Sequence, residues 1–252
     1  MADKPTVRTC VFCGHPNVTK EHVFPLWLRK VVIDEVADHM SIQLDRSGAV
    51  IEHRTYQAGA FSLEVKRVCQ EECNGGWMSR LERTAQPLLQ PMLEGRGRVF
   101  HESGQQILAT WAYKTALMLN FAGPQDTRAA TPDEYRHLHR HRQPPSSARI
   151  WPFAHGEGPQ HTASFRHHPL YIGAQIAGID SGAPPNGYML GFTVGHLGFL
   201  VFNTTAPDHE LEIPQPWERA IPRIWPSVNA SITWSPRPAL SQEQFVALVD
   251  SI

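Results

Sequence analysis

The stretch Cys69-Gln70-Glu71-Glu72-Cys73-Asn74-Gly75-Gly76-Trp77-Met78 decides how the N-terminal third of the chain folds. It places two cysteines in C-x3-C spacing and follows them directly with an asparagine. Apolar residues then recur at spacings of three and four, which predicts a helix from about Asn74: Trp77, Met78, Leu81, Ala85, Leu88, Leu89 and Met92. Pro87 and Pro91 fall inside this pattern and predict a kink or break.

A second cysteine pair, Cys10 and Cys13, stands in C-x2-C spacing near the start of the chain, and the two pairs use all 4 cysteines. A tight turn lets both sulfurs of a pair reach one ion, and two pairs complete the closed tetrahedral site of structural zinc. Two disulfides, or four buried reduced thiols, are the alternatives. So few cysteines indicate a reducing, cytoplasmic compartment, which favours zinc.

Between the two pairs lies the segment Glu21-His22-Val23-Phe24-Pro25-Leu26-Trp27-Leu28. With the cysteine pairs and Asn74, this layout resembles the HNH endonuclease superfamily, the ββα-metal nucleases built on a treble-clef zinc finger. It is similar in particular to HNH-type proteins of bacteria and phages in which Glu-His-x-x-Pro-x-Trp-Leu follows the first pair. The resemblance covers residues 10 to about 82. It implies His22 as the general base, with Glu21 and Asn74 holding a catalytic metal separate from the structural zinc.

The chemistry of these side chains fits that assignment. Phosphodiester hydrolysis needs a deprotonated water and a divalent cation that neutralises charge on the phosphate. A histidine suits the base role near neutral pH, and carboxylate and amide oxygens suit Mg²⁺ or Mn²⁺. Three alternatives stay open: His22 as a structural residue packed beside zinc, Glu21 as a solvated surface residue, and Asn74 as a helix N-cap.

The chain departs from the family pattern at two points. The second pair has one more intervening residue than the usual C-x2-C, and the middle residue of the HNH signature has no clear match, because Glu64 near that place is not equivalent. A non-catalytic zinc finger that binds nucleic acid or protein is therefore the second hypothesis. A purely structural zinc domain, with the function in the C-terminal part, is the third.

The rest of the sequence predicts an α+β fold. Two hairpins are expected: Ser41–Asp45 with Ala49–Tyr56 around Arg46-Ser47-Gly48, and Tyr188–Val194 with Leu197–Asn203 around Gly195-His196. Leu63–Val68 is a further strand. Helix N-termini are expected at Ser103, Thr131 and Ser241, each in a capping-box pattern. The predicted organisation is an HNH-like zinc module (1–95), a helical connector (96–145) and a mixed, strand-rich C-terminal domain (146–252).

Composition bounds the partners. The 252 residues carry 23 basic and 24 acidic groups, so the formal net charge is −1 and a wholly basic nucleic-acid coat is excluded. Binding of nucleic acid, with DNA favoured over RNA, must then rely on a local patch. Candidates are Lys20, Lys66, Arg67, Arg80 and Arg83. No signal peptide or membrane segment is evident.

The remaining histidines are not expected to bind metal: those at 137–141 form a solvated basic face that could contact phosphates, and the tryptophans are expected to pack in the core. His137 and His141 share one helix face, and His167 and His168 point to opposite faces of a strand. Trp77 and Trp111 stand at helical core spacing.

Overall fold

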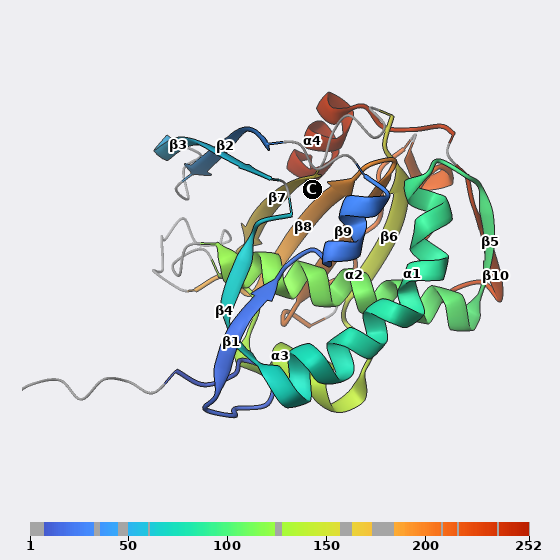
Figure 1. Ribbon diagram of the computed structural model, residues 1–252. Coiled ribbons are helices and arrows are strands. Elements are labelled where there is room, and N and C mark those ends of the chain that lie inside the picture. The colour runs from blue at the N-terminus through green and yellow to red at the C-terminus, as the bar shows by residue number, and fades with distance from the viewer. Residues whose placement is uncertain are drawn as a thin grey trace, which may run out of the picture.

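The computed structural model describes residues 8–32, 36–44, 50–59, 61–123, 128–156, 163–172, 184–207, 209–215, 217–235 and 237–251. The fold is mixed α+β, as the sequence predicts. A four-stranded antiparallel sheet, in the order β6-β9-β8-β7, forms its largest layer (Figure 1). Its strands are β6 (Arg149–Ala154), β7 (Ala163–Leu170), β8 (Gly187–Val194) and β9 (Leu197–Thr204).

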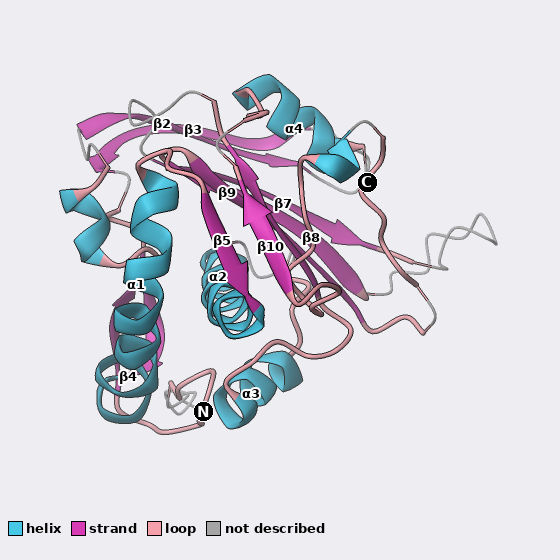
Figure 2. Ribbon diagram, turned by 90° about the vertical axis from the view of Figure 1, so that its right-hand side faces the viewer, coloured by secondary structure: helices cyan, strands magenta, loops and turns pink. Residues whose placement is uncertain are grey.

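The long helix α2 (Glu102–Ala122) lies against one face of this sheet, and the C-terminal helix α4 (Gln242–Asp250) lies against the other (Figures 1 and 2). Strands β8 and β9 are buried along their whole length. Alternate residues explain this burial: Leu190 and Phe199 belong to the cluster around α2, whereas Met189 and Leu200 belong to the cluster around α4. A strand covered on both faces reads as a continuous apolar run.

The predicted hairpin signals are confirmed. β8 and β9 pair across Gly195, whose φ of +55° suits a two-residue turn. β2 (Val36–Leu44) pairs with β3 (Val50–Gly59), while the predicted turn Arg46-Ser47-Gly48 lies outside the described residues. The strand predicted at 63–68 is β4 (Glu64–Cys69).

Helix α1 (Ser79–Leu93) passes through Pro87 and Pro91 without interruption, so the predicted break is wrong. Pro91 has no N–H for the carbonyl of Pro87. That carbonyl instead accepts a hydrogen bond of 2.9 Å from Nη1 of Arg98. A distant side chain thereby satisfies the group that proline leaves unpaired.

The start predicted for the next helix is also wrong. The capping box at Ser103 is not used, because α2 begins at Glu102 with His101 as its N-cap. Strand β5 (Arg98–His101) runs directly into the helix and pairs with β10 (Ser231–Trp234), so tertiary pairing sets the start. The other two boxes are confirmed, at Thr131 before α3 (Pro132–His141) and at Ser241 before α4.

One buried carboxylate of helix α3, that of Glu134, binds side chains of three other elements. It accepts hydrogen bonds from the hydroxyls of Tyr113 (2.6 Å) and Tyr188 (2.8 Å) and from Nδ2 of Asn203 (2.6 Å). These donors come from α2, β8 and β9. Three donors offset the cost of burying a charged group and fix the position of α3.

Helix α2 occupies the centre of the molecule, between the large sheet and α1 (Figure 2). It lies in the region that the sequence predicts as a helical connector. One hydrophobic cluster contains Phe12, Trp111 and Phe199, and so runs through all three predicted regions. In the described part of the chain, no helix combines the length and apolar character needed to cross a membrane.

Candidate metal centre and the residues beside it

The four cysteines come together at one end of a small two-stranded antiparallel sheet. Strand β1 (Val18–His22) pairs with β4, and this register sets Val18 opposite Cys69. The loop that carries Cys10 and Cys13 precedes β1 and is tied to β4 by a hydrogen bond of 2.9 Å from the N–H of Val11 to the carbonyl of Arg67. Cysteines far apart in the sequence therefore become neighbours.

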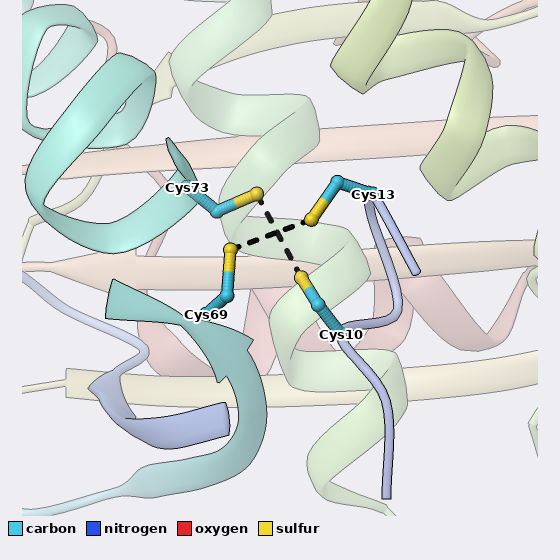
Figure 3. Close-up of side chains that lie close together, drawn as sticks. All are labelled: Cys10, Cys13, Cys69 and Cys73. Atoms are coloured by element: carbon cyan, nitrogen blue, oxygen red, sulfur yellow. Dashed lines mark hydrogen bonds between the residues drawn. The ribbon is translucent and has the colours of Figure 1, made fainter. Parts of the chain in front are cut away.

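Local backbone geometry turns both pairs inward. In the first loop, the N–H of Gly14 donates to the carbonyl of Cys10 at 2.9 Å, and Gly14 adopts a φ of +81° that few other residues tolerate. The second pair spans the end of β4 and the π-helical turn η2 (Gln70–Met78), which leads into α1. All four side chains point toward one another (Figure 3).

The sulfur positions fit a tetrahedral ion. The Sγ atoms of Cys10 and Cys73 lie 3.7 Å apart, those of Cys13 and Cys69 lie 3.4 Å apart, and all four lie within 4.8 Å of one another. A tetrahedron with Zn–S bonds of about 2.3 Å has S–S edges of about 3.8 Å. Disulfide sulfurs would be about 2.05 Å apart, and all four cysteines are free thiols.

The four sulfurs influence one another electrostatically. The contact between Cys10 and Cys73 lowers the pKa of Cys10 to about 4 and raises the pKa of Cys73. Burial raises the pKa of Cys13 to about 12. The protein alone thus stabilises a thiolate at Cys10 and disfavours one at Cys13 and Cys73. A divalent ion supplies the charge that lets buried thiolates coexist.

Beyond the cysteines, the structure brings Glu21 and Asn74 together. Asn74 donates from Nδ2 to the backbone carbonyl of Lys20 at 3.2 Å, which places its side chain beside Glu21, the next residue on β1. Burial raises the pKa of Glu21 to about 7, although attraction to Lys114 and the nearby Asn74 amide act in the opposite direction. The solvated-surface alternative for Glu21 is excluded, since the residue is only 7% exposed.

Lys114 and Glu82 complete this cluster. The Nζ atom of Lys114 lies 2.9 Å from Oε1 of Glu82 and 3.7 Å from Oε1 of Glu21. Burial alone would lower the pKa of Lys114, but the two carboxylates outweigh it and raise that pKa. Sequence reasoning missed both residues. The available signal was Lys114 itself, a cation within the apolar run 111–119 of a helix.

His22 lies on the other face of β1. Its Nε2 atom is 3.5 Å from Oε1 of Glu64, its register partner on β4, and the Nζ atom of Lys20 is 2.8 Å from Oε2 of the same carboxylate. Neighbouring side chains in a strand point to opposite faces, which separates His22 from Glu21. The His22 side chain is 32% exposed and therefore accessible to solvent.

No arrangement for a catalytic metal is evident from these side chains alone. Among the described residues, the four cysteines form the only group of three or more histidine, cysteine or acidic side chains able to share an ion. Glu21 and Asn74 would supply two oxygen ligands of the six that Mg²⁺ takes, leaving the others to water and substrate.

The remaining candidates take structural positions. Trp77 and Trp111 are buried, and the rings of His137 and His141 lie 4.5 Å apart on one face of α3. On β7, Nε2 of His167 is 2.8 Å from Asn120, whereas Nε2 of His168 is 2.8 Å from Asp250. Of the predicted basic rim, Lys20 pairs with Glu64. The others are Lys66, Arg67, Arg80 and Arg83, which lie on β4 and α1.

Comparison with known proteins gives no relative: no family model, no curated protein and no solved structure matches this chain.

Proposed function

We propose that the chain is an HNH-type, metal-dependent nuclease whose N-terminal part is a treble-clef module held by a structural zinc ion. Two features support the module. A loop with one cysteine pair precedes β1, which pairs with β4 in a two-stranded antiparallel sheet, and the second pair stands where β4 passes into η2 and α1. The resemblance implies the same order of cysteine loop, paired strands and helix.

The observation that carries the catalytic proposal is the position of Asn74, which follows Cys73 directly and binds the backbone carbonyl of Lys20, the residue before Glu21. The resemblance assigns Glu21 and Asn74 to one metal, and they are far apart in the sequence. Glu82 takes the shorter contact with Lys114, at 2.9 Å against 3.7 Å for Glu21. Of the two carboxylates, Glu21 is therefore the one that more readily gives up its contact with Lys114 and binds a metal ion instead.

Each residue then has a defined task. A Mg²⁺ or Mn²⁺ ion held by Glu21 and Asn74 would neutralise charge on the scissile phosphate. His22 accepts the proton of the attacking water at its exposed ring. Glu64, 3.5 Å from Nε2 of His22, orients that ring.

Nicking of supercoiled plasmid tests metal dependence. We expect cleavage with added Mg²⁺ or Mn²⁺, none without, and a loss of at least about tenfold for Glu21→Gln and Asn74→Ala. Glu52→Gln, on β3, is the matched carboxylate control and should cleave like the wild type. Cleavage that is equal in all four proteins would contradict the proposed metal site.

One observation favours a second candidate, a zinc module that binds nucleic acid or protein without cutting. Lys114 already places a cation beside Glu21, and His22 faces away from it. This alternative predicts bound zinc and binding of a labelled duplex, with no cleavage under any divalent metal.

A further inference from the structure

A cavity of about 870 Å³ adjoins the cysteine cluster and is rich in arginine. It lies between the Cys10–Gly14 loop, β4, the C-terminal end of α2 and α3. Its charged lining consists of arginines and one histidine, His139, and no aspartate or glutamate is among the described residues that line it. The arginines are Arg67, Arg128, Arg136, Arg140 and Arg142.

Nearby negative charge does not account for all five. A zinc ion with four thiolates carries a net charge of about −2 and offsets two of them. Asp133 offsets a third, because its Oδ1 lies 2.5 Å from Nη2 of Arg136, and Glu72 attracts Arg142. Among the described residues, Arg67 and Arg128 have no carboxylate within ion-pair distance. An excess of guanidinium charge therefore faces the cavity.

Arg67 and Arg128 are held as a pair by one aromatic ring. The Cζ atom of Arg128 lies 4.1 Å from the centroid of the Phe121 ring, and that of Arg67 lies 5.5 Å from the same centroid. Each also donates from Nε to a backbone carbonyl, Arg67 to Thr9 at 3.1 Å and Arg128 to Gly123 at 3.2 Å. These contacts fix two like charges near each other, and among the described residues no acceptor takes their terminal Nη groups, which are therefore suited to bind an anion.

We propose that this cavity binds the phosphate backbone of a nucleic-acid strand, with Arg67 and Arg128 as the principal phosphate contacts. Arg136 and Arg140 extend the positive charge along α3, one helical turn apart and exposed at the rim. A row of cations matches a chain of phosphates better than a single free phosphate. The inference rests on the proposed nucleic-acid substrate, but not on cleavage.

The position of the cavity fits the proposed reaction. Arg67 and Glu64, the register partner of His22, lie three residues apart on β4, so the arginine pair and His22 border the same pair of strands. Phosphate contacts of this kind set the register of the substrate without reading its bases.

Fluorescence anisotropy with a labelled oligonucleotide tests the proposal, in a His22→Ala background and without added divalent metal, so that cleavage does not interfere. Arg67→Gln/Arg128→Gln should weaken binding at least about tenfold and reduce the slope of log K against log salt by about 1.5, between about 50 and about 200 mM salt. Arg237→Gln, an exposed arginine outside the cavity, is the matched control and should change neither quantity.

If the double variant fails to fold, Arg140→Gln still tests the proposal, because this side chain is exposed on α3 and its replacement should not disturb the fold. It should reduce the salt slope by about 0.8. Slopes and affinities equal to those of Arg237→Gln in both variants would overturn the proposal. Binding that depends on the arginines, together with no cleavage in the plasmid-nicking assay, would support the phosphate-binding cavity and refute the nuclease. Cleavage of plasmid, together with binding that does not depend on the arginines, would support the nuclease and refute the phosphate-binding cavity.

Discussion

The Nζ atom of Lys114, in the middle of α2, lies 2.9 Å from Oε1 of Glu82 in α1. The lysine side chain is fully shielded from solvent, and that of Glu82 is 19% exposed. Together with Glu21 on β1, this ion pair joins the central helix to both parts of the cysteine-bearing module. Removal of the ammonium would leave two carboxylates facing each other in a buried space.

We therefore expect Lys114→Met to lower the free energy of unfolding by about 3 kcal/mol or more, since breaking a buried pair leaves uncompensated charge. Urea denaturation measures the loss. The double variant Glu82→Gln/Lys114→Met should lose less than the sum of the two single variants. A loss below about 1 kcal/mol for Lys114→Met would show that the pair does not matter for stability.

His167 should make stability depend on pH. Burial lowers its pKa to about 4, with a smaller contribution from His168. A histidine protonates in the unfolded chain at a pKa of about 6.5. The unfolded state thus binds more protons between pH 4 and 6.5, and stability must fall as pH drops through this range.

Between pH 6.5 and 4 the free energy of unfolding should fall by about 2 kcal/mol through His167. The value is smaller than the full shift in pKa implies, because the residue keeps some exposure to solvent. Urea denaturation at several pH values measures it, with His167→Gln as the comparison. The variant should show a shallower decline between pH 6.5 and 4. Identical pH dependence in the two proteins would mean that His167 titrates normally in the folded state.

Two glycines offer opposite predictions for the same substitution. A Cβ atom on Gly198 would lie 2.0 Å from Cζ of Phe153, whose ring stacks on Phe245, so Gly198→Ala should cost about 3 kcal/mol. Gly104 lies in α2 and has its nearest neighbour at 3.5 Å, so Gly104→Ala should stabilise by about 0.5 to 1 kcal/mol. Thermal melting compares both. A stable Gly198→Ala would indicate that this sheet face is loosely packed.

The cysteine cluster predicts about one zinc ion per chain by elemental analysis. Cys69→Ser should lose the zinc and melt at a lower temperature, because the ion joins the first loop to β4 and to η2. His15→Ala is the control, since this exposed residue adjoins the first loop without being one of the four ligands. Retention of zinc by Cys69→Ser, or unchanged melting after chelation, would count against a structural zinc site.

Local signals in the sequence were enough to predict several elements. The Gly195-His196 turn and the capping boxes at Thr131 and Ser241 depend on neighbouring residues. Each is confirmed because the physical cause lies within a few positions.

The failures share a different cause. Helix α1 survives Pro91 because Arg98 binds the freed carbonyl of Pro87, and α2 starts early because β5 pairs with β10. Both are long-range contacts that no local pattern reveals. The same holds for the candidate site, where the proximity of Glu21 and Asn74 was predicted but Lys114 was not.

We propose that His22 acts as the base in phosphodiester cleavage. The rate at which zinc-loaded protein cuts a labelled DNA duplex with Mn²⁺ tests this role. We expect His22→Ala to cut at least about 100-fold more slowly than the wild type. His209→Ala, an exposed histidine, should cut at the wild-type rate. Equal rates for wild type and His22→Ala, or no cleavage by either, would contradict the account.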